Sequence, residues 1–435
     1  MNNTHRFDKY LGTLWRSRDF RTLWISLTIT HFGGQVTFLA LPLTAALILN
    51  ASPLEMGILT AVEALPYTIF GLFTGVLVDR SKKLPLIIMA DVGRGLALLA
   101  VPVAAWFGFL SMSVLYVVGF LVGLGGIIGW AAYQVFMTER VGRENLVEAN
   151  SRIALSDSSA QLLGPGLAGV FIHWLTAPFA ILLDAIAFFT SAWMLKSIKP
   201  QDSDAPKMGT SGATVWQDAK EGLHLIWHHP VLRSLAWGLA IWQFLKHMYF
   251  AIVILFAARD LALSPGKIGA IWMMGGIGFL IASVWVQKVN RQFGVGRVML
   301  AGLLATGVSW LLIAFLSPGD WAGVNLGFAI FILDLGAMLF FINYLTLRQS
   351  VTPDHLLGRV TSTMIFLSIA MAPLGSLVGG AMAEAFGLRT PIGVAGVGTL
   401  LLALLLTRFS PLAAMHELPT HVPTPPASSQ ELAAD

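Results

Sequence analysis

The chain has 435 residues, of which 56% are hydrophobic and only 11% are charged, whereas a soluble domain carries about 25% charged residues. A water-soluble protein of this length cannot bury so much apolar surface in one core, which excludes an ordinary soluble enzyme. The absence of cysteine excludes disulfide-stabilised secreted folds and thiol chemistry. The net charge is +4 and the basic residues are spread over short loops, which favours a membrane surface over nucleic acid as the acidic neighbour.

A polar, basic segment, residues 1–22, leads directly into the first apolar stretch. This stretch is too long for a signal peptide and has no small-residue cleavage site, so we predict a spanning helix. Further stretches follow that are long enough to cross about 30 Å of hydrocarbon. The predicted spans of the first set cover residues 23–49, 54–79, 84–107, 111–138, 147–172 and 177–196.

The polar stretch 198–230 separates this set from a second one. Its first part is rich in Pro, Ser and Gly, which is typical of a flexible linker. In its second part Val215, Trp216, Leu223 and Trp227 alternate with polar residues, which predicts a helix along the membrane interface. A solvent-facing linker helix is the alternative.

The second set of spans is predicted over residues 232–258, 264–288, 296–317, 322–347, 357–385 and 389–408. The predicted fold is therefore an all-α integral membrane protein with twelve transmembrane helices. Its domains are an N-terminal bundle (23–197), a C-terminal bundle (231–408) and a tail (409–435) whose Pro and Ser content predicts disorder.

The orientation follows from the basic residues, which concentrate on the side of the N-terminal segment. The opposite side holds only Arg259, Lys267 and Arg389. Because cytoplasmic loops are enriched in Lys and Arg, both termini are predicted to be cytoplasmic, and we expect the chain in a bacterial cytoplasmic membrane.

The two sets of spans also align with each other. GVLVDR at 75–80 matches SVWVQK at 283–288, and the Gly-Pro element around Pro165 matches the one around Pro373. Both alignments place the copies 208 residues apart, from Asp79 to Gln287 and from Pro165 to Pro373. This predicts parallel repeats of six helices, the plan of transporters whose substrate site lies between the halves.

Several motifs resemble those of the major facilitator superfamily. The sequence GVLVDRSKK at 75–83, continued by Asp91 and Arg94, is similar to its G-x-L-x-D-R-x-G-R-R loop, although Lys82 replaces the second Gly. GPGLAG at 164–169 resembles the exporters' G-P-x-x-G-G element, with Ala168 in place of one Gly. RSRDFRTLW, ENLVEANS and TPDHLLGRVTST resemble the drug-efflux branch that includes macrolide exporters and the enterobactin exporter.

The loop motif is interpreted as a gate. Small Gly75 is expected where two helices approach closely. Asp79 is expected to cap the helix that begins near Arg359 and to pair with Arg80 or Arg94. With the carboxylate of Glu139, this network would latch the halves on the cytoplasmic side; simple anchoring of helix ends at the headgroups is the alternative. Gly164, Pro165 and Gly169 predict a hinge or close crossing, with plain packing equally possible.

Ionisable residues inside spans are costly and are therefore functional candidates. The proton-coupling candidates are Asp334, Glu63 and Asp157. Asp157 shares a helix face with Gln161 and Gly164, whereas Asp184 is expected to make a structural hydrogen bond.

The resemblance implies that the first, fourth, seventh and tenth spans line a central cavity. Trp242 is placed to stack under Lys246 four residues later. For each candidate an inter-helix hydrogen bond is the alternative to substrate contact. The substrate-cavity candidates are His31, Gln35, Tyr133, Gln134, Trp242, Gln243, Lys246, His247, Asn343 and Tyr344.

These patterns predict a proton-coupled antiporter that exports a small amphiphilic or hydrophobic compound, drug-like or endogenous. The alternatives are a siderophore exporter, a lysophospholipid flippase and a membrane sensor that transports nothing. No P-loop or metal-binding motif occurs, so ATP is not the direct energy source. We expect no enzymatic activity, cofactor, metal or nucleic-acid partner, and a monomer in the lipid bilayer.

Overall fold

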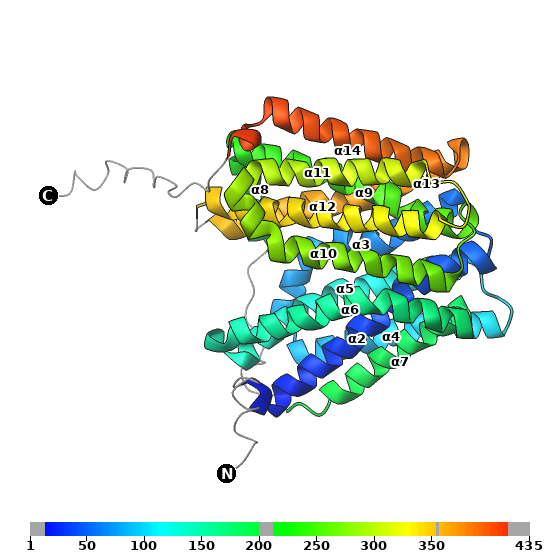
Figure 1. Ribbon diagram of the computed structural model, residues 1–435. Coiled ribbons are helices and arrows are strands. Elements are labelled where there is room, and N and C mark those ends of the chain that lie inside the picture. The colour runs from blue at the N-terminus through cyan, green and yellow to red at the C-terminus, as the bar shows by residue number, and fades with distance from the viewer. Residues whose placement is uncertain (1–13, 200–211, 354–355, 416–435) are drawn as a thin grey trace, which may run out of the picture.

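The computed structural model describes residues 14–199, 212–353 and 356–415, and their secondary structure is entirely helical. Most of the predicted N-terminal segment, the flexible part of the linker and the predicted disordered tail lie outside these residues. Two successive groups of long helices make up the molecule (Figure 1). The first group is α2 (Arg18–Leu43), α3 (Pro53–Asp79), α4 (Lys83–Trp106), α5 (Met112–Val141), α6 (Leu146–Leu175) and α7 (Ala177–Leu195). The second is α9 (Pro230–Arg259), α10 (Pro265–Phe293), α11 (Val295–Ala314), α12 (Ala322–Val351), α13 (Leu357–Phe386) and α14 (Arg389–Phe409).

Local sequence signals set the helix ends. Ser52 and Glu55 form a capping box at the start of α3, where Pro53 takes the first helical position and loses no hydrogen bond there. Gly142 and Gly294, with φ of 79° and 87°, follow the last residues of α5 and α10. These backbone angles favour glycine because a Cβ would clash.

Among the described residues, ten helices are long and apolar enough to cross a membrane, and α3 is an eleventh if its bend is counted within one span. The helix α6 is as long as its neighbours but carries Glu148, Arg152 and Asp157 in its first half and does not belong to the ten. The multi-pass architecture is thus present, while the predicted count of twelve spans stays a prediction.

The internal repeat is visible in the helix positions. The helix α9 begins at Pro230 and α10 at Pro265, each 212 residues after its counterpart at Arg18 or Pro53. This spacing differs by about one helical turn from the 208 residues between the aligned motifs. The two halves are therefore built in the same order.

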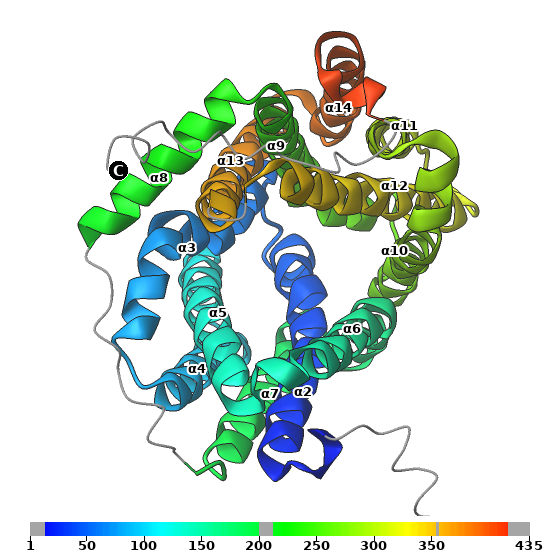
Figure 2. The same cartoon turned by 90° about the vertical axis from the view of Figure 1, so that its left-hand side faces the viewer.

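The helix α8 (Gly212–His228) lies across one end of the bundle, which we call the α8 end. Both ends of the described chain also lie there (Figure 1). Seen from this end, the ribbons of the two halves surround a common centre (Figure 2). The helix α8 packs against α13, because a Cβ at Gly222 would lie 2.8 Å from the carbonyl oxygen of Arg359. The opposite end is called the far end.

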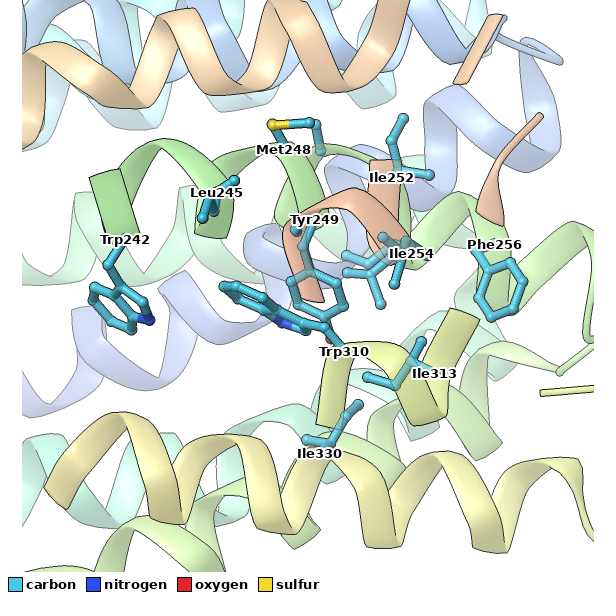
Figure 3. Packing of buried hydrophobic residues seen from close by; sticks show 14 of the residues in the cluster. Trp242, Leu245, Met248, Tyr249, Ile252, Ile254, Phe256, Trp310, Ile313 and Ile330 are labelled. Carbon is cyan, nitrogen blue, oxygen red and sulfur yellow. The ribbon is translucent and has the colours of Figure 1, made fainter. Parts of the chain in front are cut away.

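The apolar core is extensive around α9. The rings of Tyr249 on α9 and Trp310 on α11 lie 5.4 Å apart between centroids, with Ile313 and Ile330 beside them (Figure 3). This packing holds α9, α11 and α12 together. On α9, the Trp242 ring lies 5.2 Å between centroids from the ring of Phe340 on α12.

Candidate functional site

The halves contact each other backbone to backbone at the far end. A Cβ at Gly57 of α3 would lie 2.8 Å from the Cα of Gly380 on α13, and a Cβ at Gly169 of α6 would lie 3.1 Å from the Cα of Gly269 on α10. In the repeat, α3 corresponds to α10 and α6 corresponds to α13. The α3–α13 contact and the α6–α10 contact are therefore equivalent crossings. We call them the glycine crossings. Small residues permit such close approach in lipid.

The Gly-Pro element of α6 thus lies at a close crossing, one of its predicted roles. Gly169 packs on α10, and a Cβ at Gly164 would lie 2.7 Å from the Cβ of Gln35 on α2. Gly75, by contrast, lies in open space, since a Cβ there would meet no atom within 4 Å. The close approach predicted at Gly75 is absent from this structure because α3 ends at the α8 end, away from the glycine crossings.

A cavity of about 520 Å³ is lined mainly by the second half and also by Gln161 of α6. We call it the central cavity. Its walls come mainly from α9 and α12, as the resemblance implies, and combine aromatic rings with charges. The polar and aromatic lining includes Trp242, Gln243, Lys246, Asp334, Phe341, Tyr344 and Arg348.

The charges of the central cavity are two cations and one acid. The ammonium of Lys246 lies 5.2 Å from the centroid of the Trp242 ring, which confirms the predicted cation-π contact. The guanidinium of Arg348 lies 5.5 Å from the Tyr344 ring. Asp334 interacts electrostatically with Lys246, but no ion pair shorter than 4.0 Å joins them in the described chain. The cavity therefore offers a positive wall to an anionic or electron-rich group.

Glu63 lies where the two halves meet. It borders a cavity of about 280 Å³ together with Tyr67 of α3 and with Gln243 and His247 of α9. The Nδ1 atom of His247 lies 2.8 Å from the carbonyl oxygen of Gln243. Glu63 thus belongs to the N-terminal bundle and also borders the space between the two halves.

The third proton-coupling candidate, Asp157, lies at the crossing of α2 and α6. Gln161 donates a hydrogen bond from Nε2 to Asp157 Oδ2 at 2.8 Å, which confirms the predicted shared face. The Nδ1 atom of His31 lies 3.5 Å from Asp157 Oδ1. Because Gln35 packs on Gly164, this crossing brings together five residues singled out from the sequence.

Other cavity candidates lie away from the central cavity. Asn343 is fully buried, and its Oδ1 accepts a hydrogen bond of 2.7 Å from Asn290 Nδ2, so it links α10 and α12. Tyr133 is buried inside the N-terminal bundle. Gln134 is exposed.

The gate residues are distributed differently from the prediction. Arg359 pairs with Glu221 of α8. Arg94 lies inside the N-terminal bundle, with its guanidinium 3.9 Å from the Phe188 ring and within electrostatic reach of Asp91 and Asp184. The predicted pairing of Asp79 with Arg94 is therefore wrong for this conformation.

Arg80, the other predicted partner of Asp79, is exposed. Asp79 is half-buried at the end of α3, and Glu139 is half-buried near the end of α5. Asp184 accepts a hydrogen bond of 2.5 Å from Thr37 Oγ1, as expected from the sequence.

Tyr67 and Thr37 line a cavity of the first half and Arg348 lines the central cavity, although no sequence pattern singled them out. Asp91 and Arg94 did carry a signal, because two ionisable residues within one apolar span indicate a buried site and not a loop.

Comparison with known proteins identifies the family. The sequence profile of the Major Facilitator Superfamily matches residues 23–373 and 248–431. The chain belongs to this superfamily. It is 28% identical over 367 residues to the multidrug efflux pump Tap of Mycolicibacterium fortuitum, covering 82% of this chain and 87% of Tap. It is 24% identical over 365 residues to the enterobactin exporter EntS of Salmonella typhimurium, covering 81% of this chain and 82% of EntS.

The fold agrees with solved superfamily structures. A bacterial homologue of the iron transporter ferroportin, in an inward-facing state, superposes with a TM-score of 0.74 at 16% identity, covering 91% of this chain and 99% of that chain. The predicted resemblance to the drug-efflux branch is confirmed by the two exporters. The protein is thus a member of a transporter superfamily with efflux pumps among its relatives.

Proposed function

We propose that the protein is a secondary transporter of the bacterial cytoplasmic membrane that exports a small amphiphilic or hydrophobic compound in exchange for protons. The observation that carries this proposal is the central cavity of about 520 Å³, which is bordered by the membrane carboxylate Asp334. The glycine crossings bring the two halves into close contact at the far end, which supports a closed far end. The direction of transport is supported by the two exporters among the relatives.

The proposed topology has twelve spans, with the α8 end in the cytoplasm. The described helix ends and loops at that end carry most of the basic residues, Arg80, Arg140, Lys288 and Arg359 among them, as expected for the cytoplasmic side. In this orientation the structure is an inward-facing state, ready to receive a compound from the cytoplasm.

In the proposed cycle the compound packs against the aromatic rings of Trp242, Phe341 and Tyr344, while its polar group meets Lys246. The halves then rock, which separates the glycine crossings and closes the α8 end near Gly75 and Asp79. Protonation of Asp334 removes its attraction for Lys246 and favours the return. The membrane potential contributes about 2.3 kcal/mol per charge for each 100 mV.

A second candidate cargo is an anionic siderophore. Lys246 and Arg348 outnumber Asp334 among the charges of the central cavity, which suits a catecholate or carboxylate compound, and one relative is named an enterobactin exporter. The mechanism would be unchanged.

The test uses inside-out vesicles from an efflux-deficient bacterium that expresses the full chain. An acid-inside pH gradient should drive uptake of the lipophilic cation ethidium or of a catecholate siderophore, and an uncoupler should abolish it. Vesicles without the protein are the control. Uncoupler-resistant movement of a fluorescent lysophospholipid, with no gradient-driven uptake of either probe, would contradict the proposal and favour a flippase.

A further inference from the structure

Two further cavities are stacked between the α8 end and the far end. One lies inside the N-terminal bundle, and the other lies between that bundle and α9. The one nearer the α8 end has about 250 Å³ and is bordered by Ile87, near the start of α4, and by Leu195, at the end of α7. The one nearer the far end has about 260 Å³ and is bordered by Pro42 and Met56 of the first half and by Phe250 of α9. Each is roomy and polar enough to hold several water molecules.

Arg94 and Tyr67 line both cavities and therefore form the partition between them. The stem of Arg94 packs on α5, since a Cβ at Gly125 would lie 2.5 Å from its Cγ. The hydroxyl of Tyr67 packs on the same helix, 2.7 Å from the Cβ position of Gly126. The two glycines thus create the space in which these polar side chains sit.

A carboxyl group lies on each side of this partition. Asp91 lines the cavity nearer the α8 end and accepts a hydrogen bond of 2.6 Å from Ser191. Asp184 lines the cavity nearer the far end and accepts one from Thr37. Both interact electrostatically with Arg94. Two carboxylates and one guanidinium carry a net negative charge, which is costly in a low-dielectric interior, so the neutral arrangement holds one proton on the pair.

The other titratable groups around Arg94 come from each packed helix. His31 of α2 and Tyr133 of α5 face the cavity nearer the α8 end, and His31 contacts Asp157 of α6. Glu63 of α3 faces the cavity nearer the far end. Because Glu63 also borders the space between the halves, it connects the stacked cavities to that space.

We propose that the N-terminal bundle contains a proton pathway of its own, in which Asp91 and Asp184 share one proton across a partition formed by Arg94 and Tyr67. The proton enters from the far-end cavity onto Asp184, passes by way of the Tyr67 hydroxyl to Asp91, and leaves to water at the α8 end. Tyr67 gives one proton as it takes another, and Arg94 keeps its charge throughout. The direction of proton flow rests on the proposed proton-driven export. The presence of the shared proton does not depend on that proposal.

Infrared spectroscopy of the full chain in liposomes tests the shared proton without any transported compound. The spectrum of each variant is compared with that of the wild type at the same pH. The signal is the C=O stretch of protonated carboxyl groups. Asp91→Asn and Asp184→Asn should each remove one protonated group, because the remaining carboxylate is balanced by Arg94. Arg94→Gln should have the opposite effect and add one, since both acids then stay protonated. Asp320→Asn, in an exposed loop, is the matched control and should leave the signal unchanged.

Tyr67→Phe tests the partition, because it keeps the ring and removes only the hydroxyl. Exchange of the shared proton in D₂O should become about 100-fold slower, the size expected when a positioned proton donor is lost. The proposal is refuted if neither aspartate variant removes a protonated group, if Arg94→Gln lowers the signal, or if Tyr67→Phe exchanges at the wild-type rate. Vesicle transport decides separately whether the protein is a proton-driven exporter.

Discussion

At the scale of single residues, the membrane carboxylates divide between two settings. Asp334 borders the central cavity beside Lys246, and Glu63 borders the space where the halves meet. Both carboxyl groups can therefore interact with a compound that lies between the halves. Asp157 instead has His31 and Gln161 as direct partners, which stabilise it at the crossing of α2 and α6.

Replacing Asp334 by Asn and Glu63 by Gln should each weaken coupling to protons. We expect gradient-driven uptake into inside-out vesicles to fall by about 100-fold, because a group that must gain and lose a proton is removed. Asp320→Asn serves as the control. If both variants transport normally against a gradient, the coupling assignment is wrong and Asp157 becomes the next candidate.

Lys246 should determine which charge the cavity prefers. Lys246→Met keeps the length of the stem but removes a charged hydrogen-bond donor, a loss of about 1.5–3 kcal/mol for a carboxylate ligand. Binding of a carboxylate or catecholate probe should weaken about 10- to 100-fold, while ethidium should not bind more weakly. Isothermal titration calorimetry measures both affinities, and equal losses for the two probes would contradict this role.

Single residues also show what the sequence could and could not reveal. The Trp242–Lys246 contact and the Asp157–Gln161 hydrogen bond were predictable because both depend on spacing within one helix. The cluster around Arg94 was not, since it is assembled from α3, α4 and α7 and depends on how these helices pack. The close approach expected at Gly75 was wrong for a related reason, because its neighbours depend on how α3 packs against other helices.

At the scale of elements, the helix boundaries followed closely from local sequence. Apolar length, the capping box at Ser52 and glycines beyond α5 and α10 are all local signals. The helix α8 was predicted as a helix, but its docking on α13 through Glu221 and Arg359 joins residues 138 positions apart. Such pairing is set by tertiary packing and leaves no local signature.

The glycine crossings should tolerate no larger side chain. Gly57→Val and Gly169→Val would overpack a backbone contact at a cost of about 1–3 kcal/mol, which should depopulate the conformation seen in this structure and reduce transport. Gly93→Val on α4 is the matched control, because its Cβ would meet no atom within 4 Å. Thermal unfolding and vesicle transport should separate the first two variants from the third. Equal behaviour of all three would show that the crossings are not required.

At the scale of the whole molecule, the duplicated halves carry different chemistry. The N-terminal half holds the buried acids around Arg94, whereas the C-terminal half places Lys246 and Arg348 in the central cavity. The two halves therefore share the order of their helices but differ in the charges that they bury. The offset between the aligned motifs predicted the repeat. Only the three-dimensional arrangement shows that the charges form two separate clusters, one in each half.

The topology can be tested with single cysteines, because the chain has none of its own. Asp320→Cys lies between α11 and α12, and Glu144→Cys between α5 and α6; both positions are exposed. A membrane-impermeant thiol reagent should label Asp320→Cys in intact cells and Glu144→Cys only in inside-out vesicles. Labelling of both from the same side would refute the proposed orientation.

The duplicated glycine crossings also restrict how the molecule can move. Each crossing is part of a longer contact, since Thr68 of α3 donates a hydrogen bond to the carbonyl oxygen of Ile369 on α13, and a Cβ at Gly276 of α10 would lie 2.9 Å from the Cα of Leu162 on α6. A turn of one half about the line through the two crossings would therefore shift the packing nearer the α8 end and leave the crossings in contact. Opening the far end is a different motion, because both crossings must separate.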